Sequence, residues 1–201
     1  MNCSSLTSMT IPASMTSIED RAFNDCVGLK ELIIEDSQNT LFLGSNDPGT
    51  GCNFDFGIFV STSLFCGLQL ETLYMGRNLT CQRDDSDEDN NIVYFWNCTK
   101  LKTVELGNYV TKISFGSFPG CSSLTSVTIA EGSKLTSIGG YAFRDCSSLG
   151  SITIPEGVIS IGSGAFYNCN GLSSITIPEN VTSIGDNAFY NSAREIILQS
   201  T

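Results

Sequence analysis

The chain has 201 residues, of which 41% are hydrophobic and only 15% are charged, and its formal net charge is −11. This composition excludes a disordered acidic chain, and the acidic excess excludes nucleic acid as a partner because nucleic acid attracts clustered Lys and Arg. The absence of His removes the commonest general base and the commonest transition-metal ligand. No apolar run is long enough to cross a bilayer, and the first ten residues lack the pattern of an export signal. We therefore expect no membrane insertion within this chain.

A motif of the form C-x-x-L-x-x-I-x-I recurs along the whole chain, and each copy is called a rung below. Successive copies are commonly 23 residues apart, as Cys146 and Cys169 are. The rungs start at Cys3, Cys26, Cys66, Cys98, Cys121, Cys146, Cys169 and Ser192. A fixed period of this length is typical of a solenoid, in which each unit buries its apolar side only against its neighbours. We predict one domain over residues 1–201, with insertions near residues 36–63 and 80–93.

The sequence pattern of each rung predicts two strands and one turn. The L-x-x-I-x-I stretch combines β-branched alternation with a Pro or Gly stop, which is typical of a strand followed by a turn. The Val-x-x-Ile stretch, as at residues 158–161, is too short for a helix and predicts a second short strand on the opposite wall. Gly or Ser before Ala-Phe, as at residues 162–166, favours one helical or 3₁₀ turn. We therefore expect a β-rich solenoid with one continuous parallel sheet, short second strands and short helical turns.

Stacking identical rungs places identical positions on top of one another, so four apolar columns are predicted to form the core. The leucine column is Leu6, Leu29, Leu70, Leu101, Leu124, Leu149 and Leu172. The next two are Met9, Leu32, Leu73, Val104, Val127, Ile152 and Ile175, and Ile11, Ile34, Met75, Leu106, Ile129, Ile154 and Ile177. The phenylalanine column is Phe23, Phe95, Phe118, Phe143, Phe166 and Phe189. Each buried side chain of this kind is worth about 1.5–3 kcal/mol.

The unit C-x-x-L-x-x-I-x-I-P-x-x-V-x-x-I-x-x-x-A-F resembles the BspA-like (Treponema-type) leucine-rich repeat family. The resemblance extends from Cys3 to about Leu198 and rests on eight repetitions. It implies a right-handed leucine-rich-repeat coil. It also implies an extracellular setting on a bacterial cell surface, and adhesion to host proteins or to other cells.

Seven of the nine cysteines occupy one position of the repeat. Parallel, in-register side chains point the same way rather than at each other, and the column holds an odd number of cysteines. We therefore expect small buried thiols that pack as hydrophobic groups rather than a disulfide framework. Zinc is disfavoured because neither CxxC nor His occurs. Cys52 and Cys81 lie in the insertions, where a bridge between them remains an alternative to two thiols.

The sequence contains none of the common catalytic or cofactor-binding motifs. The chain has no GxSxG, no Walker loop, no GxGxxG and no His for a catalytic triad. The acidic run DDSDEDNN (84–91) lacks the spacing and the central Gly of an EF-hand calcium loop, so a solvated loop is expected there. We predict no enzymatic activity, no cofactor and no bound metal.

Candidate ligand-binding residues are found on the strands whose outward-facing positions are not the usual Ser and Thr. Residues on either side of the central apolar position point away from the core, because successive strand residues face opposite sides. On most rungs these pairs are Ser and Thr, as at Ser126 and Thr128. The second to fourth rungs instead carry Glu31 and Ile33, Thr72 and Tyr74, and Thr103 and Glu105. These six residues, beside the two insertions, are the predicted site for a protein or glycan ligand.

Two other functions remain open. A structural spacer without a ligand site would show a uniform polar face, and an intracellular interaction scaffold would carry reduced cysteines equally well. Residue 3 already belongs to a standard rung, although solenoids need polar caps. We therefore expect the chain to be a fragment of a longer surface protein whose export signal lies elsewhere.

Overall fold

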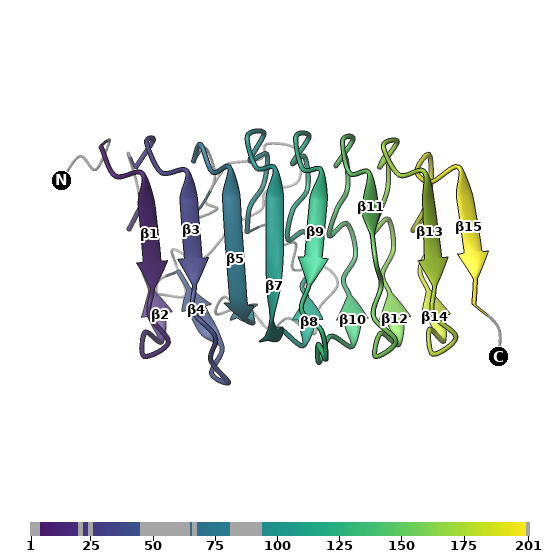
Figure 1. Cartoon of the computed structure of the whole chain (residues 1–201), viewed down its shortest axis with the longest axis horizontal. Coiled ribbons are helices and arrows are strands. Elements are labelled where there is room, and N and C mark those ends of the chain that lie inside the picture. The colour runs from purple at the N-terminus through teal and green to yellow at the C-terminus, as the bar shows by residue number, and fades with distance from the viewer. Residues whose placement is uncertain are drawn as a thin grey trace.

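The computed structural model describes residues 5–19, 22–23, 26–44, 65, 68–80 and 94–199. Its rungs stack side by side along one axis in chain order, with the first and last strands at opposite ends of the stack (Figure 1). All the strand pairs are parallel, and the described residues contain no helix. The architecture is the β-rich leucine-rich-repeat solenoid that the sequence predicts.

The L-x-x-I-x-I segments form the long strands of one wall. These strands are β1 (Ser8–Ile11), β3 (Glu31–Ile34), β5 (Thr72–Arg77), β7 (Thr103–Tyr109), β9 (Ser126–Ile129), β11 (Ser151–Ile152), β13 (Ser174–Ile177) and β15 (Glu195–Leu198). The first six pair in chain order into one sheet, and β13 pairs with β15. The outward side of these strands, called the strand face below, faces the viewer in Figure 1. Pairing lapses between β11 and β13, so the predicted sheet is continuous over six of these strands.

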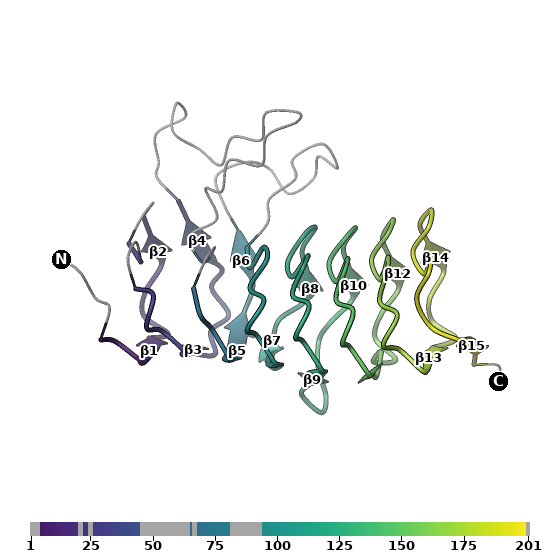
Figure 2. The ribbon, with the colours of Figure 1, turned by 90° about the horizontal axis from the view of Figure 1, so that it is seen from above.

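The opposite wall consists of the short second strands, and Figure 2 shows the two walls edge-on. One group is β2 (Ser17–Ile18), β4 (Leu41–Leu43) and β6 (Leu79–Thr80). The other is β8 (Lys112–Ile113), β10 (Ser137–Ile138), β12 (Ser160–Ile161) and β14 (Ser183–Ile184). Strand β4 falls inside the stretch predicted as the first insertion, so that rung continues to residue 43. Residues 45–64 and 81–93, where both predicted insertions mainly lie, are outside the described residues.

In the rungs whose Ala-Phe segment the structure describes in full, this segment is a pair of turns rather than a helix. In one rung Ala165 N donates to Gly162 O (3.2 Å) and Tyr167 N donates to Gly164 O (3.0 Å). These are the i→i+3 bonds expected of a 3₁₀ turn, but Gly164 and Asn168 have φ values of 60° and 59°. A left-handed residue interrupts a right-handed helix, so each turn ends after a few residues.

The predicted columns form one continuous core. Ring centroids in the phenylalanine column are between 4.8 and 5.6 Å apart from Phe23 to Phe189. Phe65, which the sequence analysis did not assign, fills the place between Phe23 and Phe95. The described cysteines of the column, which are Cys26, Cys98, Cys121, Cys146 and Cys169, are buried thiols. Cys3, Cys66, Cys52 and Cys81 lie outside the described residues.

Candidate ligand-binding face

The structure brings the six predicted site residues together as two adjoining rows on the strand face. Register between β3, β5 and β7 aligns Glu31 with Thr72 and Thr103. The same register aligns Ile33 with Tyr74 and Glu105. All six side chains are exposed or half-buried, whereas the residues between them are buried. Alternation along each strand and identical register between strands therefore produce the patch that the sequence predicts.

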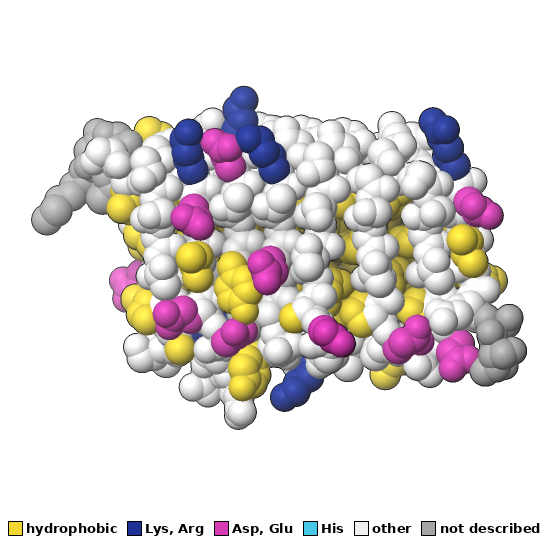
Figure 3. Space-filling view, viewed as in Figure 1, with side chains coloured by type: hydrophobic (Ala, Val, Ile, Leu, Met, Phe, Trp, Pro, Cys, Tyr) yellow, Lys and Arg dark blue, Asp and Glu magenta, His cyan; other side chains and the backbone are white. Residues whose placement is uncertain are grey.

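A shallow depression of about 450 Å³ lies over this patch. All six predicted residues line it, and Ser126 and Thr128 of β9 complete its border. Figure 3 shows hydrophobic and acidic side chains next to each other on this part of the face. An aromatic ring, an aliphatic side chain and carboxylates in one depression can contact both apolar and polar groups of a ligand.

Tyr74 is held in place by a contact that crosses from its own strand to the end of the preceding one. Its hydroxyl donates a 2.8 Å hydrogen bond to Oδ2 of Asp36, which follows β3. Gly107 of β7 makes room for this contact, since a Cβ there would lie 2.6 Å from the Tyr74 hydroxyl oxygen. Burial, the bond to Asp36 and the negative charges of Asp36 and Glu105 raise the pKa of Tyr74 to about 12. The phenol is therefore neutral at physiological pH, and its ring is oriented before any ligand arrives.

A charged cluster lies at the start of the same three strands. The Glu71 carboxylate is 2.7 Å from Lys102 Nζ and 3.3 Å from Lys30 Nζ. The hydrogen bond from Lys102, followed by that from Lys30, lowers the pKa of Glu71 below its usual value. These side chains are substantially exposed, so the cluster contributes little to stability. With two ammonium groups to one carboxylate, it gives this edge a net positive charge.

This cluster was not among the predicted site residues, although the repeat pattern contains the signal for it. Lys30, Glu71 and Lys102 each directly follow the leucine of their rung. In a solenoid a repeat position becomes a spatial column, so Lys, Glu and Lys at one position predict two ion pairs. Figure 3 extends the pattern: cations gather mainly where the strands begin, and carboxylates mainly along the edge where they end.

Arg77 also lies outside the predicted site residues. It is fully buried, and its guanidinium donates to the carbonyl oxygens of Pro12 (2.8 Å), Ala13 (3.2 Å) and Met15 (2.8 Å). These carbonyls belong to the turn between β1 and β2, two rungs earlier. Burial lowers the pKa of Arg77, and the negative charge of Glu35 opposes that shift. Arg77 therefore fastens the first rung to the rungs of the candidate site.

No group of three or more His, Cys, Asp and Glu side chains in the described ranges is arranged to hold a metal ion. Among the same residues there is also no helix of the length and apolarity needed to cross a membrane.

Solved structures share this fold. A leucine-rich repeat protein from Bacteroides ovatus is 28% identical with a TM-score of 0.60, and one from Eubacterium ventriosum is 26% identical with a TM-score of 0.67. These similarities cover 94% and 92% of this chain but 47% and 43% of the two bacterial proteins. The chain therefore spans less than half of their length. A leucine-rich repeat protein from T. pallidum, 23% identical with a TM-score of 0.50 over 73% of this chain and 67% of its own, shares the fold.

No curated protein is similar enough to the chain to count as a relative. The pattern of the BspA type leucine rich repeat region matches residues 1–45 and 91–197 in six copies. Leucine-rich repeats of this kind typically form interaction modules without enzymatic activity. Since the match extends over well more than half of the sequence, the chain belongs to the BspA-type leucine-rich repeat family.

Proposed function

We propose that the protein is a non-enzymatic adhesion module that recognises a protein partner through the strand face of its second to fourth rungs. The observation that carries the proposal is the fixed ring of Tyr74. Its hydroxyl is bound to Asp36, while Ile33 and Glu105 occupy the same row on either side of it. A prearranged aromatic side chain loses little conformational freedom on binding, which is why tyrosine dominates many recognition surfaces.

The uneven decoration of the strand face supports a binding module over a structural spacer. Across β9, β11 and β13 the outward positions hold only Ser and Thr. Across β3, β5 and β7 they hold an aromatic ring, an isoleucine and two glutamates. A spacer has no requirement for such a concentration. A glycan is the second candidate ligand, because hydroxyl and carboxylate groups beside a tyrosine can also bind sugar hydroxyls.

We further propose that the chain is part of a longer protein displayed on a bacterial cell surface, with a host-derived ligand. Membership of the BspA-type family and the bacterial origin of the similar structures support this setting. The larger size of those structures supports the longer protein.

The proposal can be tested by screening the purified chain against host matrix proteins and a glycan array. For the tightest partner found, Tyr74→Ala with Glu105→Ala should weaken binding at least about tenfold, a loss of about 1.4 kcal/mol. The matched control is Ser174→Ala with Thr176→Ala, which truncates the corresponding outward positions of β13. Equal losses from the two variants would place the site elsewhere, and a failure to bind any protein or glycan would favour the spacer.

A further inference from the structure

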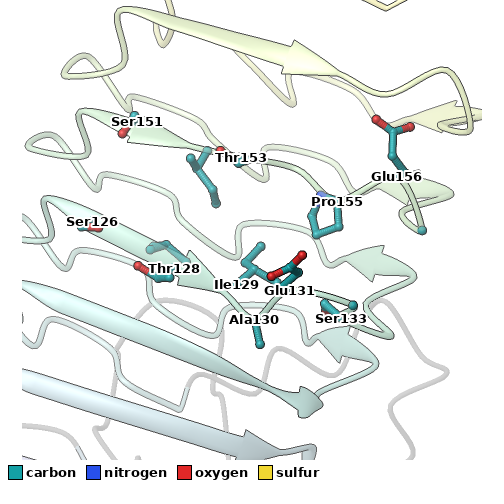
Figure 4. A pocket seen from close by; sticks show the side chains of 14 residues that line it. Ser126, Thr128, Ile129, Ala130, Glu131, Ser133, Ser151, Thr153, Pro155 and Glu156 are labelled. Atoms are coloured by element: carbon teal, nitrogen blue, oxygen red, sulfur yellow. The ribbon is translucent and has the colours of Figure 1, made fainter.

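A second hollow, of about 570 Å³, lies between β9 and β11, outside the predicted site. Ile129, Ile152 and Pro155 supply apolar lining, while Thr128, Thr153 and Ser133 add hydroxyl groups. Figure 4 shows these side chains between the ends of the two strands and the turns that follow them. Hydrophobic surface is also visible between β9 and β11 in Figure 3.

Two features of the sequence open this hollow. The rung that starts at Cys121 is longer than the standard rung, since Cys146 follows after 25 residues instead of 23. The added length lies in the turn after β9, where Gly132 has a φ of 72° and open space around it. On the other side, Pro155 has no N–H to donate to β9, whereas Ala130 at the same repeat position donates to Leu106 O (2.9 Å). Strands β9 and β11 therefore separate after Val127 and Ile152, whereas β7 and β9 stay paired as far as Leu106 and Ile129.

The hollow reaches the hydrophobic core. Ile129 belongs to a column whose described members are otherwise buried, including Leu106 before it and Ile154 after it. Ile129 alone among them is only half-buried. An apolar side chain that enters the hollow could therefore cover a core residue that the fold itself leaves partly open to water, which is favourable.

The mouth of the hollow is acidic. Glu131 and Glu156 lie on the two turns that border it. Figure 4 shows the Glu131 carboxylate near Ile129, whereas the Glu156 carboxylate lies beyond Pro155 and points away from Ile129. Neither carboxylate forms an ion pair with another described residue. Lys134, in the same turn as Glu131, instead places its Nζ over the ring of Tyr109, 5.2 Å from the ring centroid. The lining contains two carboxylates and no cation.

We propose that this hollow binds a lysine side chain of a protein partner, with the aliphatic stem against Ile129 and Pro155 and the ammonium group at Glu131, while Glu156 adds a second negative charge at the border. Lysine matches the site because it buries its methylene groups along apolar surface while its charged end stays in water. The carboxylates at the mouth supply the complementary charge. Ser126 and Thr128 border both depressions, so a partner seated on Tyr74 could reach the hollow, although the lysine site does not depend on the Tyr74 site.

The test uses the whole chain labelled at its isoleucine methyl groups and titrated in an NMR experiment. The probe is Nα-acetyl-lysine methylamide, and the neutral comparison is Nα-acetyl-norleucine methylamide, which has the stem without the charge. We expect saturable shifts of the Ile129 and Ile152 methyl signals with the lysine probe and weaker binding of the norleucine probe. Raising the ionic strength to about 1 M, where the Debye length is about 3 Å, should weaken the lysine probe alone.

Glu131→Gln with Glu156→Gln should raise the dissociation constant of the lysine probe about fivefold, the size expected when one exposed ion pair and a second nearby negative charge are lost. Glu179→Gln is the matched control, because Glu179 follows Pro178 in the next rung as Glu156 follows Pro155. Equal affinity for both probes, shifts centred on Ile33 instead of Ile129, or an equal effect of Glu179→Gln would overturn the proposal. The methyl signals of Ile33 and Ile129 report on the two sites separately. Lysine binding at Ile129 can therefore be measured even if the Tyr74 site binds no ligand.

Discussion

The Sγ atom of Cys169 donates a hydrogen bond to the carbonyl oxygen of Phe143, 26 residues earlier in the chain, at 3.0 Å. Cys98, Cys121 and Cys146 make the same contact to Phe65, Phe95 and Phe118. Ser192 differs, since its Oγ donates to the carbonyl oxygen of Phe189, only three residues earlier, at 2.8 Å. The cysteine column is thus a series of buried donors that join successive rungs, and this arrangement requires the thiol form.

The first prediction concerns the accessibility of these thiols. A thiol reagent should find few reactive groups in the native protein, because burial raises the pKa values of Cys121, Cys146 and Cys169 and the thiolate is the reactive form. After unfolding without reductant, titration should recover at least the seven thiols of the column. Recovery of two or fewer would mean that the column is oxidised.

The second prediction is a loss of stability in alkali. Burial raises the pKa values of Cys121 and Cys169 from 9.0 to about 12. Below pH 9 both states keep these protons, so the shift has no effect. As the pH rises from 9 to 12 the unfolded chain releases protons that the folded chain retains, and the unfolding free energy falls by up to about 1.4 kcal/mol per pH unit for each thiol.

Urea denaturation at several pH values measures this slope. Cys121→Ala with Cys169→Ala should make it shallower, although Tyr74, whose pKa is also raised to about 12, retains a contribution of the same sign. An unchanged slope in this variant would refute the assignment to the thiols.

The third prediction concerns the buried Arg77. Arg77→Met should lower the unfolding free energy by about 3 kcal/mol, because three carbonyl oxygens of the first turn lose a charged donor. Hydrogen exchange should accelerate mainly at residues 13–18, the segment that Arg77 holds. Arg194→Met, at an exposed position of the last rung, is the control and should change neither quantity. Uniform exchange along the chain in Arg77→Met would contradict a local fastening role.

The fourth prediction concerns the left-handed column that precedes the cysteines. Asn168 has a φ of 59°; its Nδ2 donates to Asp145 Oδ1 at 2.8 Å, and its Oδ1 accepts from Asn191 Nδ2 at 3.0 Å. Asn168→Gly and Asn168→Ala both remove these bonds, but only glycine tolerates the backbone angle without strain. Thermal denaturation should find the alanine variant less stable than the glycine variant by about 1 kcal/mol. Equal stability would show that the angle relaxes at no cost.

The sequence by itself determined the period, the buried columns and the outward positions of the strands. Each depends on a regularity that repeats every 23 residues, as from Cys146 to Cys169, and stacking converts it directly into space. The pairing of Tyr74 with Ile33 and Glu105 on the strand face was predictable for that reason. Phe65 was missed because it directly precedes Cys66, whereas Phe118 stands three residues before Cys121.

Only the tertiary structure decided which partners are contacted by the side chains that differ from the repeat consensus. Tyr74 is hydrogen-bonded to Asp36, 38 residues away, and Arg77 is hydrogen-bonded to Met15, 62 residues away. Their long polar side chains extend to partners on other rungs that do not occupy the same repeat position. The hollow beside Ile129 likewise depends on one local deviation, a longer turn after β9, that lies next to a proline without an N–H on the adjacent rung. A repeat pattern specifies the average rung, but the contacts that distinguish one rung from another arise from side-chain length and backbone spacing in three dimensions.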